Sequence, residues 1–271
     1  MKLIRTLCLA FSMYSRIPMP ILEYTQEDMR YTFLAFPLVG VVIAALEYGW
    51  FLICGRTGIG TSLYAALAAA IPVCITGGFH MDGYLDTTDA LSSHREREKK
   101  LEILKDSHVG AFAVIWTGLY LLVSYGLFTE LREKQEIIMV AIGFVLSRAT
   151  SGLAAISFPS ASGKSSLAYF AKAGDRKVVK IGLWIWIIVT CVSFICYDIR
   201  YGVTVIVVLA MWFLHYNRMS KREFGGITGG ASGDQTGKEI WVHGYYNFPW
   251  TYVLRYPEQS KGVSLVRWIP G

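Results

Sequence analysis

The chain has 271 residues, of which 54% are hydrophobic and only 17% are charged. Charged residues make up about a quarter of an ordinary soluble domain, so this composition excludes that class and indicates a polytopic membrane protein. The formal net charge is +6. Because the positive side chains lie in segments between apolar runs, membrane topology explains this charge, and no nucleic-acid partner is expected.

The N-terminal segment superficially resembles a secretory signal, because Lys2 and Arg5 precede an apolar stretch. No small-x-small cleavage site follows, and Arg16, Pro18 and Pro20 interrupt the stretch. We therefore expect an uncleaved segment that lies at the membrane interface.

Six apolar runs follow, most of them near the roughly 20 residues that a helix needs to cross the hydrocarbon. Lipid offers no hydrogen-bonding partner to a loose backbone, so each run is expected to be helical. The predicted fold is all-α, a polytopic transmembrane helical bundle of about six spans plus interfacial segments. It forms one membrane domain over residues 1–237, followed by an atypical polar tail over residues 238–271. The predicted spans are 33–53, 61–79, 110–128, 136–157, 179–197 and 201–216.

The number of Lys and Arg residues alternates between high and low in the segments that separate these runs. The counts are high in residues 1–32 (four), 80–109 (five), 158–180 (five) and 217–271 (seven). They are low in residues 54–60 (one), 129–135 (two) and 198–200 (one). By the positive-inside tendency, both termini and the two long loops are expected on the cytoplasmic side.

An acidic stretch at residues 75–90, ITGGFHMDGYLDTTDA, begins one of these cytoplasmic loops. Asp82, Asp86 and Asp89 follow one another at spacings of four and three, which place them on one face of a helix. Three adjacent carboxylates repel unless a cation lies between them, and oxygen ligands suit Mg²⁺. Gly83 lets a backbone or a phosphate approach closely. The alternative is a solvated acidic face near a helix N-terminus.

His80 lies two residues before the first of these aspartates. It is a candidate general base or metal ligand, and the alternative is an interfacial histidine without a chemical role.

Two cations are candidates for binding an anionic substrate. Lys105 follows a mixed-charge run at 95–105 that predicts a short amphipathic surface helix, and it directly precedes Asp106, a candidate fourth metal ligand. The alternative there is a plain interfacial Lys–Asp pair. Arg148 lies inside an apolar run, where a charge is costly and usually faces a cavity or a partner; the alternative is snorkelling to the interface.

A glycine-rich stretch, FGGITGGASGDQTG, surrounds Asp234. Such a backbone can cradle phosphate oxygens through its N–H groups, and Asp234 would contribute to substrate or metal binding there. The alternative is a flexible loop.

Several of these motifs resemble, in order, those of the cobalamin synthase family, the adenosylcobinamide-GDP ribazoletransferases. The most specific is GGFHMDGYLDTTDAL, which is similar to the family signature GGLHxDGLADTxDG. The tail departs from the family, because residues 238–271 contain no apolar run of span length where the family continues into one further helix. The other resembling segments are Ser15–Pro18, Phe36–Gly40, Leu104–Ser107 with Gly110, Ser147–Arg148, Pro159 and Gly225–Asp234.

The resemblance implies a Mg²⁺-dependent transferase of cobalamin biosynthesis in the cell (inner, cytoplasmic) membrane, with its active site facing the cytoplasm. The 3′-hydroxyl of α-ribazole, or of its 5′-phosphate, attacks the cobinamide-linked phosphate of adenosylcobinamide-GDP, and GMP leaves. The partners are these two substrates and the lipid bilayer, and homo-oligomerisation is left open. The implied metal ligands are Asp82, Asp86, Asp89 and Asp106, with Lys105, Arg148, Asp234 and Gly83 at the substrate and His80 beside them.

Two other classes of protein place spaced aspartates in membrane helices. A CDP-alcohol phosphotransferase-like phospholipid enzyme would need Ala-Arg where this chain has Leu85-Asp86. An ion-coupled transporter would use intramembrane aspartates, but this cluster lies at a membrane edge beside glycines and no inverted repeat is visible.

Overall fold

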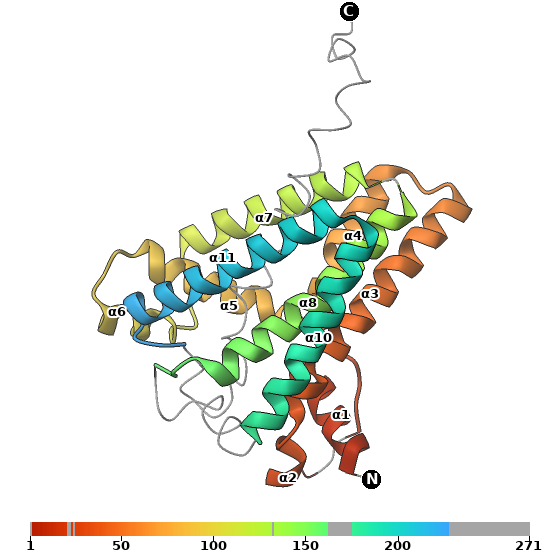
Figure 1. Ribbon diagram of the computed structural model, residues 1–271. Coiled ribbons are helices and arrows are strands. Elements are labelled where there is room, and N and C mark those ends of the chain that lie inside the picture. The colour runs from red at the N-terminus through yellow and green to blue at the C-terminus, as the bar shows by residue number, and fades with distance from the viewer. Residues whose placement is uncertain (1, 21–22, 24, 132, 162–174, 228–271) are drawn as a thin grey trace, which may run out of the picture.

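A computed structural model describes residues 2–20, 23, 25–131, 133–161 and 175–227 (Figure 1). This part of the chain consists of helices joined by short loops, with no strand, so the all-α prediction is confirmed. The predicted tail over residues 238–271 lies outside it. The helices are α1 (Lys2–Tyr14), α2 (Gln26–Met29), α3 (Thr32–Thr57), α4 (Thr61–Thr76), α5 (Phe79–Ser92), α6 (Arg97–Ile103), α7 (Ala111–Glu130), α8 (Lys134–Ser157), α10 (Arg176–Tyr197) and α11 (Ile199–Glu223).

Five of these helices, α3, α7, α8, α10 and α11, are long and apolar enough to cross a membrane. A sixth candidate span is the pair α4 and α5, which is bent by 93° at its break. The chain is therefore a multi-pass membrane protein, and the six predicted apolar runs all fall on these helices. The predicted run 61–79 ends earlier than expected, at Thr76, and the run 201–216 extends to residues 199–223.

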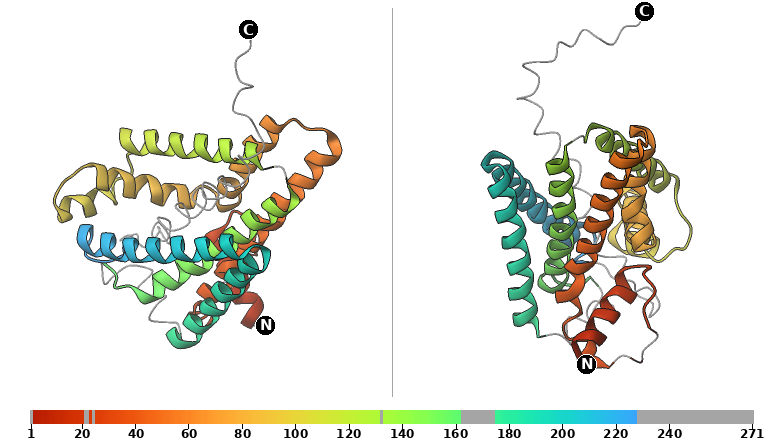
Figure 2. Two further views of the ribbon diagram at one scale, coloured as in Figure 1. Left: turned by 45° about the horizontal axis from the view of Figure 1, so that its top comes forward. Right: turned by 90° about the vertical axis from the view of Figure 1, so that its right-hand side faces the viewer.

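Helix α8 forms the centre of the bundle, with α3 along one side and α10 along the other (Figure 2). It is buried along most of its length, whereas α7, α10 and α11 each bury only a minority of their residues. The approach of α3 to α8 depends on Gly40, since a Cβ there would stand 2.6 Å from the Phe144 carbonyl oxygen. This contact explains a glycine in the middle of a span.

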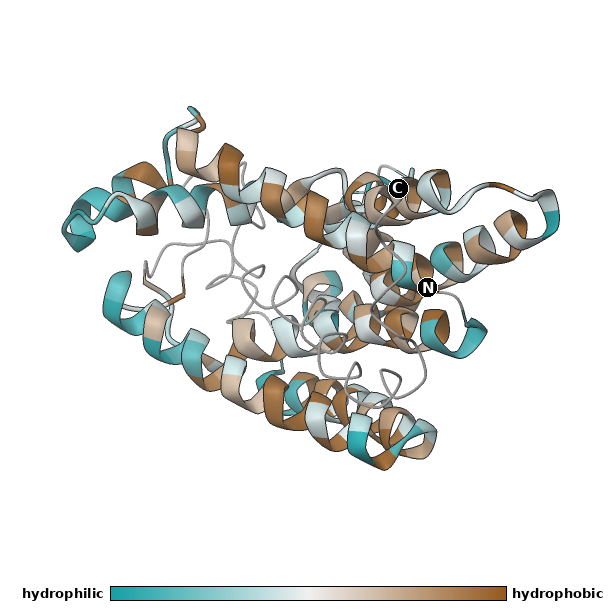
Figure 3. Cartoon of the chain, turned by 90° about the horizontal axis from the view of Figure 1, so that it is seen from above, coloured by the Kyte–Doolittle hydropathy of each residue, from teal (hydrophilic) through white to brown (hydrophobic). Residues whose placement is uncertain are grey.

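Hydrophobic residues predominate along the middle of the long helices, and hydrophilic residues gather near helix ends (Figure 3). Helix α7 exposes much of its apolar surface. Large side chains such as Trp116 and Leu122 are exposed, and only Ala113, Ser124 and Phe128 are buried. An apolar surface of this kind suits contact with lipid.

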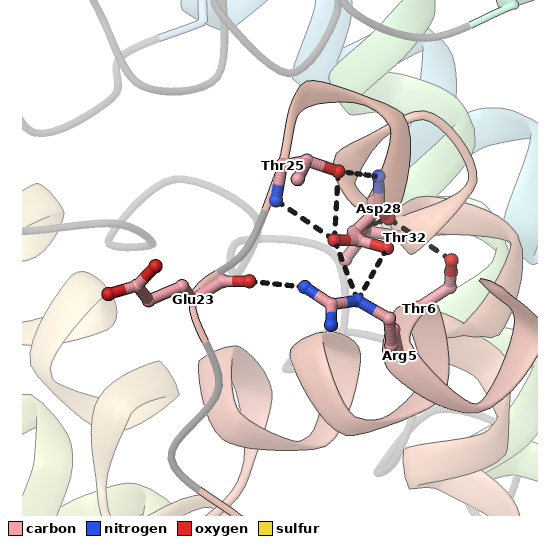
Figure 4. Close-up of polar contacts among 6 residues, drawn as sticks. All are labelled: Arg5, Thr6, Glu23, Thr25, Asp28 and Thr32. Atoms are coloured by element: carbon pink, nitrogen blue, oxygen red, sulfur yellow. Dashed lines mark hydrogen bonds and ion pairs between the residues drawn. The ribbon is translucent and has the colours of Figure 1, made fainter. Parts of the chain in front are cut away.

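The N-terminal helix α1 is tied to α2 and to the start of α3 by a polar network around Asp28 (Figure 4). Arg5 Nε donates to the Asp28 carboxylate at 3.1 Å, and the guanidinium also donates to the Glu23 carbonyl oxygen. The Thr6 and Thr32 hydroxyls donate to the Asp28 carbonyl oxygen at 3.2 and 3.3 Å. This network fixes the predicted interfacial segment against the bundle.

We expect this network to weaken in acid. The Thr25 backbone N–H, the Thr25 hydroxyl and Arg5 hold the pKa of the Asp28 carboxyl below its usual value of 3.8. Because the folded-state pKa is the lower one, the stabilisation is fully present above the unfolded pKa and is lost as the pH falls through the folded value. The protection factors of the α1 amides, which correct hydrogen exchange in nanodiscs for the intrinsic pH dependence of the exchange rate, should fall below about pH 4 in the wild type. In Asp28→Asn, these protection factors should already be lower at neutral pH and should not fall further in this range.

Candidate active site

The candidate active site begins at the corner between α4 and α5. Gly77 and Gly78 both adopt the left-handed conformation, with φ of +65° and +74°, and this pair ends α4 and redirects the chain into α5. The chain after α1 closes over the corner, because the Arg16 backbone N–H donates to the Ile75 carbonyl oxygen at 2.7 Å. The aspartate stretch therefore leaves the axis of α4 rather than extending it.

Replacing Gly77 by alanine should destabilise this corner. A left-handed conformation costs a non-glycine residue about 1–2 kcal/mol, and the new Cβ would stand 2.8 Å from Arg16 Nε and 2.9 Å from Arg16 Cδ. We expect Gly77→Ala to lower the melting temperature by several degrees, measured by thermal denaturation in detergent. The matched control is Gly118→Ala in α7, where no heavy atom lies within 4 Å of the added Cβ. This control should be neutral or slightly stabilising, and equal melting temperatures for the two variants would contradict a strained corner.

Asp82 and Asp86 lie one turn apart on α5, and both side chains are half-buried. Asp82 belongs to the first turn, where the helix dipole favours a negative charge. The two carboxylates follow the corner directly and occupy the same face of the helix, as predicted.

Asp89, the third member of the predicted cluster, binds the N-terminus of α7. Its Oδ1 accepts from the Ala113 backbone N–H at 2.9 Å, and its Oδ2 accepts from the Gly110 backbone N–H. A Cβ at Gly110 would stand 2.5 Å from the carboxylate oxygens, so only glycine allows this approach. Asp89 thereby holds α5 against α7.

Asp106 and Lys105 lie in the exposed loop before α7. Asp106 accepts from the His108 backbone N–H at 3.0 Å and contacts His108 Nδ1 at 2.7 Å, and these bonds hold the pKa of its carboxyl below the usual value. Lys105 is exposed, so its ammonium group is accessible to a phosphate. Among the described residues, no three His, Cys, Asp or Glu side chains lie close enough together to hold a metal ion by themselves.

His80 and Arg148 lie in the interior of the bundle. Their exposed fractions are 4% and 2%, so neither side chain lies on the surface of the bundle. Arg148 comes from α8, lies 5.8 Å from the Phe144 ring centroid and interacts electrostatically with His80. Rings of Phe79 and Phe36 flank His80 at centroid distances of 5.3 and 6.4 Å. Gly83 is buried on the same helix, one turn after His80.

The loop after α5 is joined to the end of α11. Helix α6 confirms the predicted short surface helix. Its Lys100 forms an ion pair with Glu223. The backbone of Ile227 then exchanges hydrogen bonds of 2.7 and 2.8 Å with Ala161 and Pro159. The glycine-rich stretch thus starts beside the segment that follows α8, while Asp234 lies outside the described residues.

A family model described as cobalamin-5-phosphate synthase matches residues 6–236. The chain belongs to this family. Its relatives include adenosylcobinamide-GDP ribazoletransferases from Lachnoclostridium phytofermentans (40% identical over 233 residues, 86% of this chain and 89% of the relative) and Clostridium perfringens strain 13 (37% over 229 residues, 83% and 90%). Another, from Halalkalibacterium halodurans, is 29% identical over 266 residues, covering 92% and 96% of the two chains.

Membership of the family confirms the resemblance found in the motifs. A second family model, described as an endolysin-like domain, matches residues 217–269, which lie mostly outside the described part of the chain, so it adds nothing to the site. No solved structure matches the protein.

Two features of the site were not predicted from the sequence. Asp89 accepts hydrogen bonds from backbone N–H groups 21 and 24 residues later, at the start of α7, and no local pattern reveals a cap at that separation. Arg16 lies against the α4–α5 corner although 61 positions separate it from Gly77. Gly77 and Gly110 are sequence signals, because a glycine can mark a close approach, but they do not name the partner.

Proposed function

We propose that this protein is a Mg²⁺-dependent adenosylcobinamide-GDP ribazoletransferase of the cytoplasmic membrane, with its active site on the cytoplasmic side. It joins α-ribazole, or its 5′-phosphate, to the cobinamide-linked phosphate of adenosylcobinamide-GDP and releases GMP. The observation that carries the proposal is the pair Asp82 and Asp86, two half-buried carboxylates one turn apart on α5 that directly follow a sharp corner in a membrane bundle. Relatives named for this activity support it.

The residues present fit a magnesium ion. Mg²⁺ in phosphoryl-transfer sites is typically held by one or two carboxylates together with substrate phosphates and water, and Asp82 and Asp86 supply two carboxylates on one helix face. When bound, the metal would neutralise charge on the diphosphate as the bond to GMP breaks. Asp89 and Asp106 remain candidate ligands, although their oxygens already accept hydrogen bonds from Gly110, Ala113 and His108.

Two cations would bind the remaining phosphate oxygens. Arg148 offers a guanidinium in a low-dielectric interior, where attraction for an anion is stronger than in water. Lys105 would reach the phosphates from the exposed loop between α6 and α7. Asp234, in the glycine-rich stretch, is retained as a candidate substrate-binding residue.

The attacking 3′-hydroxyl must lose a proton as its oxygen bonds to phosphorus. Asp82, Asp86 and His80 are the candidate acceptors, and positioning with electrostatic stabilisation can provide most of the acceleration in a phosphoryl transfer. His80 is buried among aromatic rings beside Arg148, which also suits a role in orienting that arginine.

The cytoplasmic orientation rests on the alternating Lys and Arg counts, because the loop that carries the aspartates is one of the positively charged segments. A labelling test of single cysteines introduced in loop 80–109 and in the turn 54–60 would report the two sides directly.

The proposal is tested with the purified full-length protein in liposomes. Adenosylcobinamide-GDP, α-ribazole 5′-phosphate and Mg²⁺ are supplied, and GMP and the cobamide product are measured together. We expect equal amounts of both products, none in the presence of EDTA, and recovery when Mg²⁺ is restored in excess. Absence of both products from folded, inserted protein would contradict the assignment, and movement of substrate across the vesicle without GMP release would indicate a transporter instead.

A further inference from the structure

Arg16 is a charged side chain at the α4–α5 corner that the reaction outlined above does not use. Its backbone N–H is bonded to the Ile75 carbonyl oxygen, and its Cδ and Nε lie within 2.9 Å of the position that a Cβ of Gly77 would occupy. The stem of the side chain therefore rests on the glycine backbone, which fixes where the guanidinium starts. Since Gly77 has no side chain, the corner accommodates this approach without a clash.

The guanidinium of Arg16 is exposed and forms no ion pair or side-chain hydrogen bond with any described residue. Three other arginines of this protein form ion pairs, Arg5 with Asp28, Arg30 with Asp175 and Arg222 with Glu223. Arg16 differs from exposed arginines such as Arg95 because its stem is held against the α4–α5 corner. An arginine held in place but left without a protein carboxylate is suited to bind an anion that arrives with a substrate.

The charges in the proposed reaction leave one anionic group without a cation. A divalent metal offsets the carboxylates of Asp82 and Asp86, and Arg148 with Lys105 offset the two charges of the diphosphate. A 5′-phosphate on the acceptor would add close to two further negative charges at neutral pH. Within the described part of the chain, Arg16 is the cation at the corner where α5 begins, so it is the side chain placed to receive this group.

The spacing along α5 agrees with this role. The helix starts at Phe79, next to the corner, and Asp82 lies about one helical turn, roughly 5 Å, farther along. One ribose separates the 3′-hydroxyl of a nucleoside 5′-phosphate from its phosphate by a similar span. We propose that Arg16 binds the 5′-phosphate of the acceptor while Asp82 and Asp86 hold the metal near its 3′-hydroxyl, so that Arg16 sets the preference for a phosphorylated acceptor. This inference rests on the transferase activity proposed above.

The test compares two acceptors, α-ribazole and α-ribazole 5′-phosphate, in the wild type, Arg16→Gln and Arg16→Lys, all in liposomes with saturating adenosylcobinamide-GDP and Mg²⁺. In Arg16→Gln we expect kcat/KM for the phosphorylated acceptor to fall about 10- to 100-fold, mainly through KM, since a charge-assisted pair is lost. For unphosphorylated α-ribazole it should change less than about twofold. Arg16→Lys should recover part of the loss, because lysine keeps the charge but not the fork geometry.

The matched control is Arg95→Gln, which removes an exposed arginine from the same loop as Lys105 and should leave both acceptors unaffected. Equal losses for both acceptors in Arg16→Gln and again in Arg16→Lys, a raised KM for adenosylcobinamide-GDP alone, or no change would each overturn the inference. A destabilised variant is recognised by loss of turnover with α-ribazole, and the conservative lysine variant then decides the matter through the ratio of the two acceptors. If the wild type converts neither acceptor, the proposed function has failed, which is distinct from a working enzyme whose preference ignores Arg16.

Discussion

Asp82→Asn should reduce GMP release by at least about a thousandfold while leaving the protein folded and inserted in the membrane. Asparagine keeps the shape of the side chain and its place in the first turn of α5, but it removes the negative charge that would hold the metal. A bound metal contributes several kcal/mol to stabilising charge in the transition state, and each 1.36 kcal/mol corresponds to a tenfold change in rate. Turnover in liposomes at saturating Mg²⁺ measures the effect.

Asp198→Asn is the matched control for this variant. Asp198 caps α11 by accepting from the Tyr201 backbone N–H at 2.8 Å, and asparagine caps a helix about as well as aspartate. The same loss of one negative charge should therefore leave activity nearly unchanged. Near-normal turnover in Asp82→Asn would contradict the metal site, whatever the control shows.

The apolar runs and the acidic stretch predicted much of what the structure contains. Span positions follow from the length of hydrocarbon that a helix must cross, and this constraint is local in sequence. The predicted helix ends were less accurate, because α4 ends at Thr76, and hydropathy gives no signal of the left-handed cap residue Gly77 that follows. Gly77 and Gly78 end the predicted span 61–79 early, and the chain continues after a 93° bend into α5.

The different roles of the three aspartates could not be predicted from the sequence, for a different reason. Spacings of four and three place Asp82, Asp86 and Asp89 on one helix face, but they do not say which neighbouring helix approaches that face. Helix α7 does so, and its unpaired first-turn N–H groups take up the carboxylate of Asp89. The packing of α7 against α5 therefore gives Asp89 a role that its spacing from Asp82 and Asp86 does not reveal.

Asp89→Ala should destabilise the protein by about 1–2 kcal/mol, the usual cost of losing a helix N-cap. Both carboxylate oxygens of Asp89 accept backbone hydrogen bonds at the start of α7, and alanine would leave the Gly110 and Ala113 N–H groups without that acceptor. Thermal denaturation in detergent measures this loss, and hydrogen exchange should locate it in the first turn of α7.

Asp89→Asn separates the structural role of this residue from the predicted metal-binding role. An asparagine oxygen can still accept one of the two backbone hydrogen bonds at the N-terminus of α7, so we expect a smaller loss of stability than in Asp89→Ala. Because Asp89 then acts by holding α5 against α7, turnover should fall by no more than about tenfold, far less than in Asp82→Asn. An Asp89→Asn variant that is stable but as inactive as Asp82→Asn, and whose activity recovers at high Mg²⁺, would show that Asp89 also binds the metal. Asp82→Asn and Asp89→Asn together therefore distinguish a carboxylate that takes part in the reaction from one that positions α5, the helix that carries both.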